Sequence, residues 1–252
     1  MLTFNFRLKF FFIIVTTFML FTVIGTLLHE LGHIAVAKYF GYDTYLYYGS
    51  MSSKGNNNFT EEELCVWENF IEINSEVLEN NSKEENLKLI EKEHKPLLEK
   101  FELQNKSFFW IRIGGPAQTI LTGFLGLLIL YLRKSVHKVG FKFLDWLGVF
   151  LSLFVLREAF NTITGLLDIL FFGNKSFGGD EFIISRYLGY NQWLVPVITM
   201  ILALIIAFYI VFKVIPLRYR LTFIIAGLVG GLLGYYLWFS HIGPKYFPVI
   251  EI

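Results

Sequence analysis

Apolar residues are arranged along the chain in five long runs, which a polar segment and short charged loops separate. A helix needs about 20 predominantly apolar residues to cross the hydrocarbon core of a bilayer, and each run reaches about that length. The pattern therefore predicts an all-α polytopic membrane protein with about five transmembrane helices. The expected spans cover residues 10–40, 108–132, 141–172, 193–214 and 221–240.

A polar segment at residues 41–107 separates the first two expected spans. It opens with GYDTYLYYGSM, whose alternation and tyrosine content predict a small β-hairpin. Farther on, Ser/Thr-x-x-Glu capping boxes at Thr60 and Ser82 each begin a stretch with apolar residues at helical spacing. Residues 61–102 contain 13 Glu and 5 Lys, so we expect an acidic helical insert outside the membrane, either a solvated cap or a gate for substrate.

Composition supports the membrane interpretation and argues against a soluble domain, a nucleic-acid-binding protein and a protein with an internal disulfide. Hydrophobic residues make up 54% of the chain and charged residues only 17%, against about 25% charged residues in an ordinary soluble domain. The net charge of +1 gives no basis for nucleic-acid binding, and the single cysteine, Cys65, excludes an intramolecular disulfide. In the last expected span, Gly227–Gly231 and Gly230–Gly234 form GxxxG pairs, which indicate close helix packing.

Basic residues in the short loops predict the orientation of the chain in the membrane. Nine Lys and Arg residues flank one set of span ends, and three flank the other set. This asymmetry places the N-terminus in the cytoplasm, so the end of the first span and the start of the second lie on the outer face. The nine are Arg7, Lys9, Arg133, Lys134, Lys138, Lys142, Lys213, Arg218 and Arg220, and the three are Lys175, Arg186 and Lys245.

The first expected span contains the polar sequence HELGH within an apolar run. His29 and His33 are four residues apart, so a helix places both imidazoles on one face, where they can ligate one ion. Glu30 can reach a water on that ion without being a ligand. This division of labour is typical of zinc hydrolases, so we expect Zn²⁺ at the histidines and a catalytic role for Glu30. The alternative is a pair of structural histidines bonded to neighbouring helices.

A catalytic zinc site usually takes three protein ligands, so a third ligand must come from elsewhere in the chain. The acidic candidates near the same membrane face as the HELGH sequence are Asp168, Asp180 and Glu181. Arg157 and Glu158 lie within an expected span, and we expect them to pair with each other or with neighbouring polar groups. The other histidines are His94 in the acidic insert, His137 in a loop on the opposite face and His241 at the end of the fifth span.

Three stretches of the sequence resemble the motifs of the site-2 protease family, which are intramembrane zinc metalloproteases. HELGHIAVAKYFG resembles the zinc-binding helix of that family. GGPAQ, which contains Gly115 and Pro116 and opens the second span, resembles the family's Gly-Pro element near the active site. Asn161, followed at some distance by FGGDEF, resembles its Asn…Asp-Gly element, whose Asp is the third zinc ligand. The resemblance covers the first span and residues 111–190, and it implies that Asp180 is the third ligand.

The match departs from the family pattern at three positions. Thr119 stands where the family usually has Asn, Thr164 where a Pro is common, and Glu181 where the Gly follows the Asp. Asp168 and Glu181 stay open as alternatives to Asp180.

Two further elements of the resemblance also have plain structural interpretations. Asn161 could orient a ligand or stabilise an oxyanion, or it could form a hydrogen bond between helices. Gly115 and Pro116 could position substrate, or they could mark the first turn of a helix.

The resemblance implies a zinc-dependent endopeptidase that cleaves membrane-embedded or membrane-proximal polypeptides in a bacterial cell membrane. Two alternatives stay open, namely a surface metallopeptidase for soluble peptides and a non-proteolytic, metal-binding membrane scaffold. In bacterial members of the family the active site faces the cytoplasm, whereas the loop charges here place it outside, and both orientations stay open. We divide the chain into the first span (1–40), the extramembrane insert (41–107), the core spans with the distal ligand (108–190) and two C-terminal spans (191–252).

Overall fold

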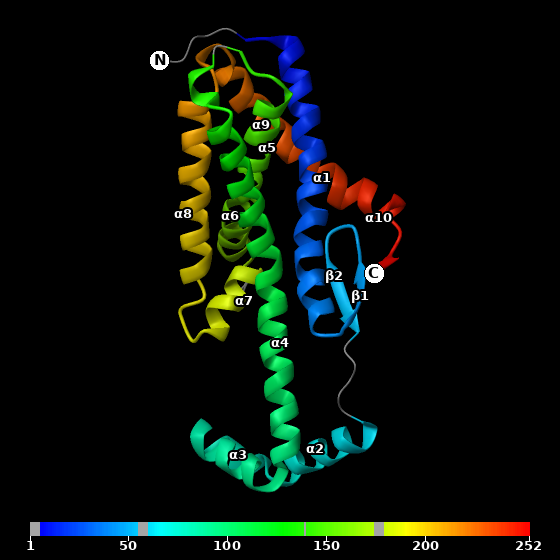
Figure 1. Ribbon diagram of the computed structural model, residues 1–252. Coiled ribbons are helices and arrows are strands. Elements are labelled where there is room, and N and C mark those ends of the chain that lie inside the picture. The colour runs from blue at the N-terminus through cyan, green and yellow to red at the C-terminus, as the bar shows by residue number, and fades with distance from the viewer. Residues whose placement is uncertain (1–5, 55–59, 139, 174–178) are drawn as a thin grey trace.

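Residues 6–54, 60–138, 140–173 and 179–252 are described by the computed structural model, which is mostly helical (Figure 1). Lys175, one of the loop cations counted above, lies outside these residues. Short 3₁₀ or π-helical turns are η1 (Ser135–His137), η2 (Leu153–Val155), η3 (Ile210–Val214) and η4 (Trp238–Ile242). The α-helices are α1 (Leu8–Tyr39), α2 (Glu61–Ile73), α3 (Ser75–Asn80), α4 (Lys83–Leu132), α5 (Phe143–Ser152), α6 (Leu156–Phe172), α7 (Asp180–Tyr187), α8 (Leu194–Tyr209), α9 (Leu217–Leu237) and α10 (Gly243–Tyr246).

Four helical segments in the described part of the chain are long and apolar enough to cross a membrane, which is compatible with a membrane protein. They coincide with four of the five expected spans. The other expected span, residues 141–172, is divided by η2 into α5 with 10 residues and α6 with 17 residues. Neither helix alone has the length of a span, so a fifth crossing stays a prediction. The four segments are Leu8–Tyr39, Asn105–Leu132, Leu194–Val214 and Leu217–Tyr246.

The main hydrophobic core lies at the end of the molecule where α1 begins. Val15 of α1, Phe150 of α5 and Phe223 of α9 belong to one buried cluster there. The expected close packing of the last span is seen for the Gly230–Gly234 pair, because a Cβ on Gly230 would lie 2.6 Å from the Val15 carbonyl oxygen of α1, whereas a Cβ on Gly231 would meet nothing within 4 Å. A Cβ on Gly234 would lie 2.9 Å from a backbone atom of α1. The contacts of α1 with this core therefore lie far from its HELGH sequence, and other residues contact that sequence.

Helix α4 is 50 residues long and runs without a loop from the acidic insert into the second expected span. Both expected capping boxes form, at Thr60 before α2 and at Ser82 before α4. Within α4 the backbone leaves helical values at His94, whose ring packs edge-on against Phe70. Helices α2 and α3 lie across the far end of α4 (Figure 1). The GGPAQ sequence therefore lies inside a helix and not near its beginning, which corrects the interpretation of Pro116 as part of a first turn.

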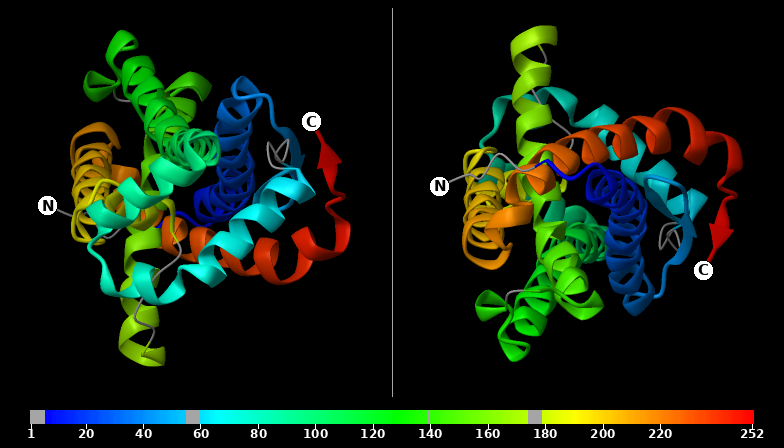
Figure 2. Two further views of the ribbon diagram at one scale, coloured as in Figure 1. Left: turned by 90° about the horizontal axis from the view of Figure 1, so that it is seen from below. Right: turned by 90° about the horizontal axis from the view of Figure 1, so that it is seen from above.

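A small sheet lies beside the end of α1. Strand β1 (Asp43–Leu46) pairs antiparallel with β2 (Met51–Lys54), as the expected hairpin requires. The chain's last strand, β3 (Ile250–Glu251), pairs with the other edge of β1 and was not expected from the sequence. Figure 2 shows this C-terminal strand beside the hairpin. The indole N–H of Trp238 also donates a 2.8 Å hydrogen bond to the Tyr48 carbonyl, so the C-terminal segment holds the hairpin in place.

Candidate metal centre

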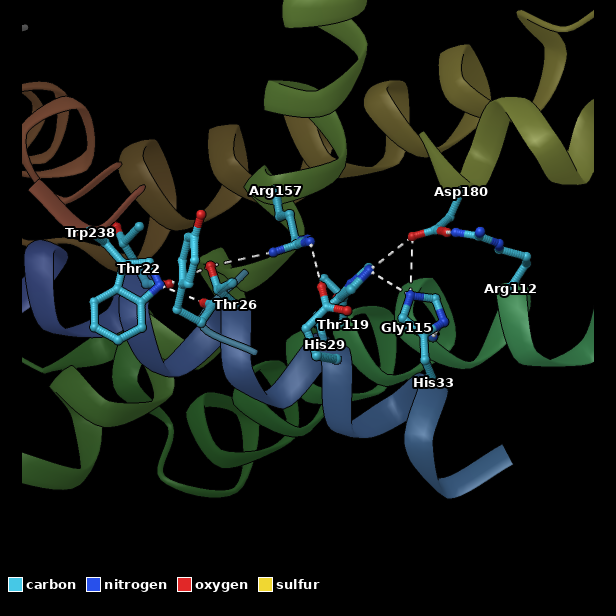
Figure 3. A network of polar contacts seen from close by, with 12 residues as sticks. Thr22, Thr26, His29, His33, Arg112, Gly115, Thr119, Arg157, Asp180 and Trp238 are labelled. Carbon is cyan, nitrogen blue, oxygen red and sulfur yellow. Dashed lines mark hydrogen bonds and ion pairs between the residues drawn. The ribbon is translucent and has the colours of Figure 1, made fainter. Parts of the chain in front are cut away.

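Three side chains from two distant parts of the chain meet beside α4 (Figure 3). His29 and His33 come from α1, and Asp180 is the first residue of α7. The two Nε2 atoms lie 3.2 Å apart, and Asp180 Oδ2 lies 3.2 Å from His29 Nε2 and 3.1 Å from His33 Nε2. Among the described residues, these three form a group that is positioned to hold a metal ion.

The spacing of the three ligand atoms fits a tetrahedral zinc ion. Zinc binds imidazole nitrogen at about 2.0–2.1 Å, so two ligands at tetrahedral corners lie about 3.3 Å apart. The three observed separations of 3.1–3.2 Å agree closely with that edge. The group could therefore accept zinc with little movement of its side chains.

Contacts with α4 orient both imidazoles. His33 Nδ1 lies 2.6 Å from the carbonyl oxygen of Ile111. A carbonyl can only accept, so a proton on this nitrogen would complete the contact and would leave Nε2 free to bind metal. His29 Nδ1 lies 2.9 Å from the Thr119 hydroxyl, which can donate or accept and so orients the ring with either nitrogen protonated. Such contacts orient metal-ligating histidines in general.

The two ring nitrogens and one carboxylate oxygen form a triangle that suits a cation at its centre, either a proton or a metal ion. The contacts in this triangle also affect the pKa of Asp180. Burial raises that pKa, but the contacts with His29 and His33 outweigh burial and hold it well below its usual value. Arg112 of α4 also donates a 3.0 Å hydrogen bond to Asp180 Oδ1, the oxygen that faces away from the histidines. These contacts favour the ionised form of Asp180, which is the form that binds metal.

Comparison of the chain with protein-family models, with curated proteins and with solved structures gives no match. The resemblance to site-2 proteases therefore stays a proposal. The chemistry of the candidate centre rests on its own geometry.

Glycines allow α1 and α4 to approach closely at the centre. A Cβ on Gly32 would lie 2.4 Å from the Gly114 carbonyl oxygen, and a Cβ on Gly114 would lie 2.5 Å from the Gly32 carbonyl oxygen. Gly115 faces the ligands themselves. A Cβ there would lie 2.3 Å from His33 Nε2 and 2.4 Å from His29 Nε2. The two glycines of GGPAQ thus leave the space in which the ligand atoms meet.

We expect the Gly115→Ala substitution to prevent metal binding. Alanine usually stabilises the interior of a helix relative to glycine by about 0.5–1 kcal/mol, so the helix itself should persist. The added methyl group would displace both Nε2 atoms, and metal titration of the purified protein measures the loss. Gly231→Ala in α9 is the matched control, because a Cβ there meets nothing within 4 Å. Native metal affinity in Gly115→Ala would contradict this account of the site.

Glu30, the expected catalytic residue, is buried beside this group on α1 but is not one of its three members. Its Oε1 lies 3.5 Å from Nη2 of Arg157 in α6. The backbone amide of Met51, at the start of β2, also lies near this carboxylate. The Glu30 side chain therefore lies between α6 and the small sheet.

The other candidates lie apart from the ligand group. Asp168 of α6 is half-buried, and Glu181 is fully buried facing Glu158. Neither belongs to the group of three. In the described part of the chain, no polar contact connects the side chain of Asn161 with the three ligands. Pro116 is buried inside α4, next to Gly115.

Sequence reasoning missed the residues that support the ligands. Thr119 was noted only as a departure from a family pattern, yet its hydroxyl holds His29. The Ile111 carbonyl has no side-chain signal at all. Arg157 was expected to pair with Glu158 or with neighbouring polar groups, and it contacts Glu30 and Thr26. Only the four-residue spacing of Ile111, Gly115 and Thr119, which places them on one face of α4, could have indicated this support.

Proposed function

We propose that the chain is a zinc-dependent endopeptidase, similar to site-2 proteases, that cleaves polypeptides embedded in or close to a membrane. The observation that carries the proposal is the convergence of His29, His33 and Asp180, with the buried Glu30 carboxyl group adjacent on the same helix. Ionisable groups on a helix apolar enough to cross a membrane are costly unless they serve a function. The presence of these costly groups therefore favours a reaction that takes place within the membrane.

The donor set supports zinc as the resident ion. Two imidazoles and one carboxylate would hold it and would leave a fourth position for water or substrate. Bound there, zinc would polarise a substrate carbonyl and lower the pKa of a water molecule. The same donors accept other divalent ions, but the tetrahedral spacing favours zinc.

Glu30 would serve as the proton carrier of the reaction. Its carboxylate would accept a proton from the attacking water and then deliver it to the nitrogen of the breaking peptide bond. Ile111 and Thr119 would keep the two imidazoles in their metal-binding orientation.

A helical substrate must unwind before attack, because its carbonyl groups are held in intrahelical hydrogen bonds. The small sheet supports this step. The strand order is β2-β1-β3, so among the described strands β2 pairs only with β1 and has a second, free edge. An extended substrate segment could pair with that edge. Met51, at the start of this strand, lies near Glu30, the proposed proton carrier.

The experiment that tests the proposal is cleavage by the purified protein in lipid vesicles. The probes are a single-span model protein with a helix-breaking Asn-Pro pair in its span and, separately, soluble unfolded casein. We expect cleavage of the single-span protein, loss of cleavage with a zinc chelator, and its return on addition of zinc. Cleavage of casein alone would favour the surface metallopeptidase. Absence of metal-dependent cleavage of either probe would favour the non-proteolytic scaffold.

A further inference from the structure

Arg157 lies beside the candidate centre, in the first turns of α6 (Figure 3). Its Nη2 lies 3.5 Å from Glu30 Oε1, and its Nη1 lies 3.5 Å from the Thr26 hydroxyl oxygen. Glu30 and Thr26 both belong to α1, one turn apart. The guanidinium group therefore faces the side of α1 that carries the proposed proton carrier.

The hydrogen-bonding capacity of Arg157 is largely unused. A guanidinium has five N–H donors. Both contacts of Arg157 are at the long limit for a hydrogen bond, and its Nε is buried without an acceptor. Such a buried donor carries a desolvation cost that calls for a partner.

Arg133 gives a direct comparison, because its side chain has the same exposed fraction of 25%. Arg133 makes two bonds of 2.9 Å and 3.2 Å to the carboxylate of Asp145, through Nε and Nη2. This is the bidentate geometry of a structural arginine–carboxylate pair. Arg157 lies near the carboxylate of Glu30 but does not form a bidentate pair with it. A structural arginine–carboxylate pair therefore does not explain the position of Arg157.

We infer that Arg157 binds the carbonyl oxygen of the scissile peptide bond and stabilises the oxyanion that this oxygen becomes. The inference rests on the proposed function. When the water oxygen adds to the carbonyl carbon, the π-electron pair of the C=O bond moves onto the carbonyl oxygen. Arg157 donates N–H hydrogen bonds to that negative oxygen, and no bond to Arg157 forms or breaks. Charged donors are especially strong in a water-poor site.

The same structure argues against Asn161 in this role. Asn161 lies one turn after Arg157 in α6, but it makes no polar contact with the three ligands or with Glu30 in the described part of the chain. The oxyanion donor of α6 would thus be the positively charged Arg157 and not the neutral amide of Asn161, one turn later. Arg157→Ala and Asn161→Ala are therefore a matched pair of variants on one helix.

The test measures kcat, KM and zinc content of both variants, and their affinity for a phosphinic peptide that mimics the tetrahedral oxyanion. For Arg157→Ala we expect kcat to fall by about 10²–10³-fold, as for loss of one oxyanion donor. Its KM should stay within about threefold, because the interaction strengthens only in the transition state. Zinc content should match the parent, and phosphinic-peptide affinity should fall with kcat. Added methylguanidine should restore part of the kcat. Asn161→Ala should stay close to the parent in every measurement.

Arg157→Lys provides a second variant if Arg157→Ala does not fold, because it keeps the charge but loses the planar fork. We expect its kcat to fall by at least about tenfold with unchanged zinc content. Parental kcat in either variant would overturn the inference, and so would loss of zinc, which would make Arg157 a structural residue. After either result, the proposed function would still hold if the parent protein cleaves substrate and Glu30→Gln abolishes that cleavage. If the parent shows no such cleavage, the proposed function and this inference fail together.

Discussion

Replacing Glu30 by Gln is expected to abolish cleavage and to leave zinc bound. The amide keeps the size of the side chain but cannot take a proton from water, and loss of a general base typically costs about 10²–10⁴-fold in rate. Zinc should remain because Glu30 is not one of the three ligands. The measurement is the rate of single-span substrate cleavage beside the zinc content of the same preparation.

Two controls make the Glu30→Gln result specific. The Glu30→Asp variant keeps the carboxylate but shortens its reach, so it should retain more activity than Glu30→Gln. Circular dichroism and thermal unfolding establish that both variants fold. A Glu30→Gln protein that cleaves at the parental rate would exclude Glu30 as the base.

Removal of His33 or Asp180 is expected to empty the proposed zinc site. The parent should hold about one zinc per chain, with three protein ligands. His33→Ala and Asp180→Ala should each weaken zinc binding by more than about 100-fold, because even residues that only orient ligands contribute about 10–100-fold. Elemental analysis after dialysis against a weak chelator measures this loss.

Asp168→Ala is the matched control for the third ligand. Asp168 was an alternative from the sequence, and it lies outside the group of three in the structure. Its variant should keep parental zinc content. Zinc loss in Asp168→Ala, with zinc retained in Asp180→Ala, would move the third ligand to α6 and overturn the centre described here.

Local sequence signals predicted much of the structure. The spacing of His29 and His33 places both rings on one face because a helix repeats every 3.6 residues. The capping boxes at Thr60 and Ser82 act within a single turn, so each could be predicted without its surroundings. The hairpin at β1 and β2 is likewise a short-range structure. In all these cases the interacting residues are close in the sequence.

Contacts between distant segments could not be predicted in the same way. β3 pairs with β1 across about two hundred residues, and no turn signal encodes that contact. The neighbours Arg157 and Glu158 point to different sides of α6, as adjacent helical residues must. Arg157 meets Glu30, whereas Glu158 is buried with Glu181.

Helix α4 shows how a local signal can mislead. Proline is common in the first turn of a helix, which suggested that Pro116 lies near a helix start. The structure places Pro116 deep inside α4, where backbone torsions stay helical apart from His94. Packing of Gly32 against Gly114 and the ligand contacts at Ile111 and Thr119 hold this part of the helix against α1.

Helices α1 and α4 cross at Gly32 and Gly114, so the geometry of the candidate centre depends on how these two helices are aligned along their axes. Sliding one helix by a single residue moves its atoms by about 1.5 Å along the axis, close to half the distance between two ligand atoms in this centre. The same slide would separate Ile111 and Thr119 from the rings they orient. If the centre binds metal as proposed, metal occupancy would report whether two long apolar helices have found their correct alignment, even in a preparation in which no reaction is followed.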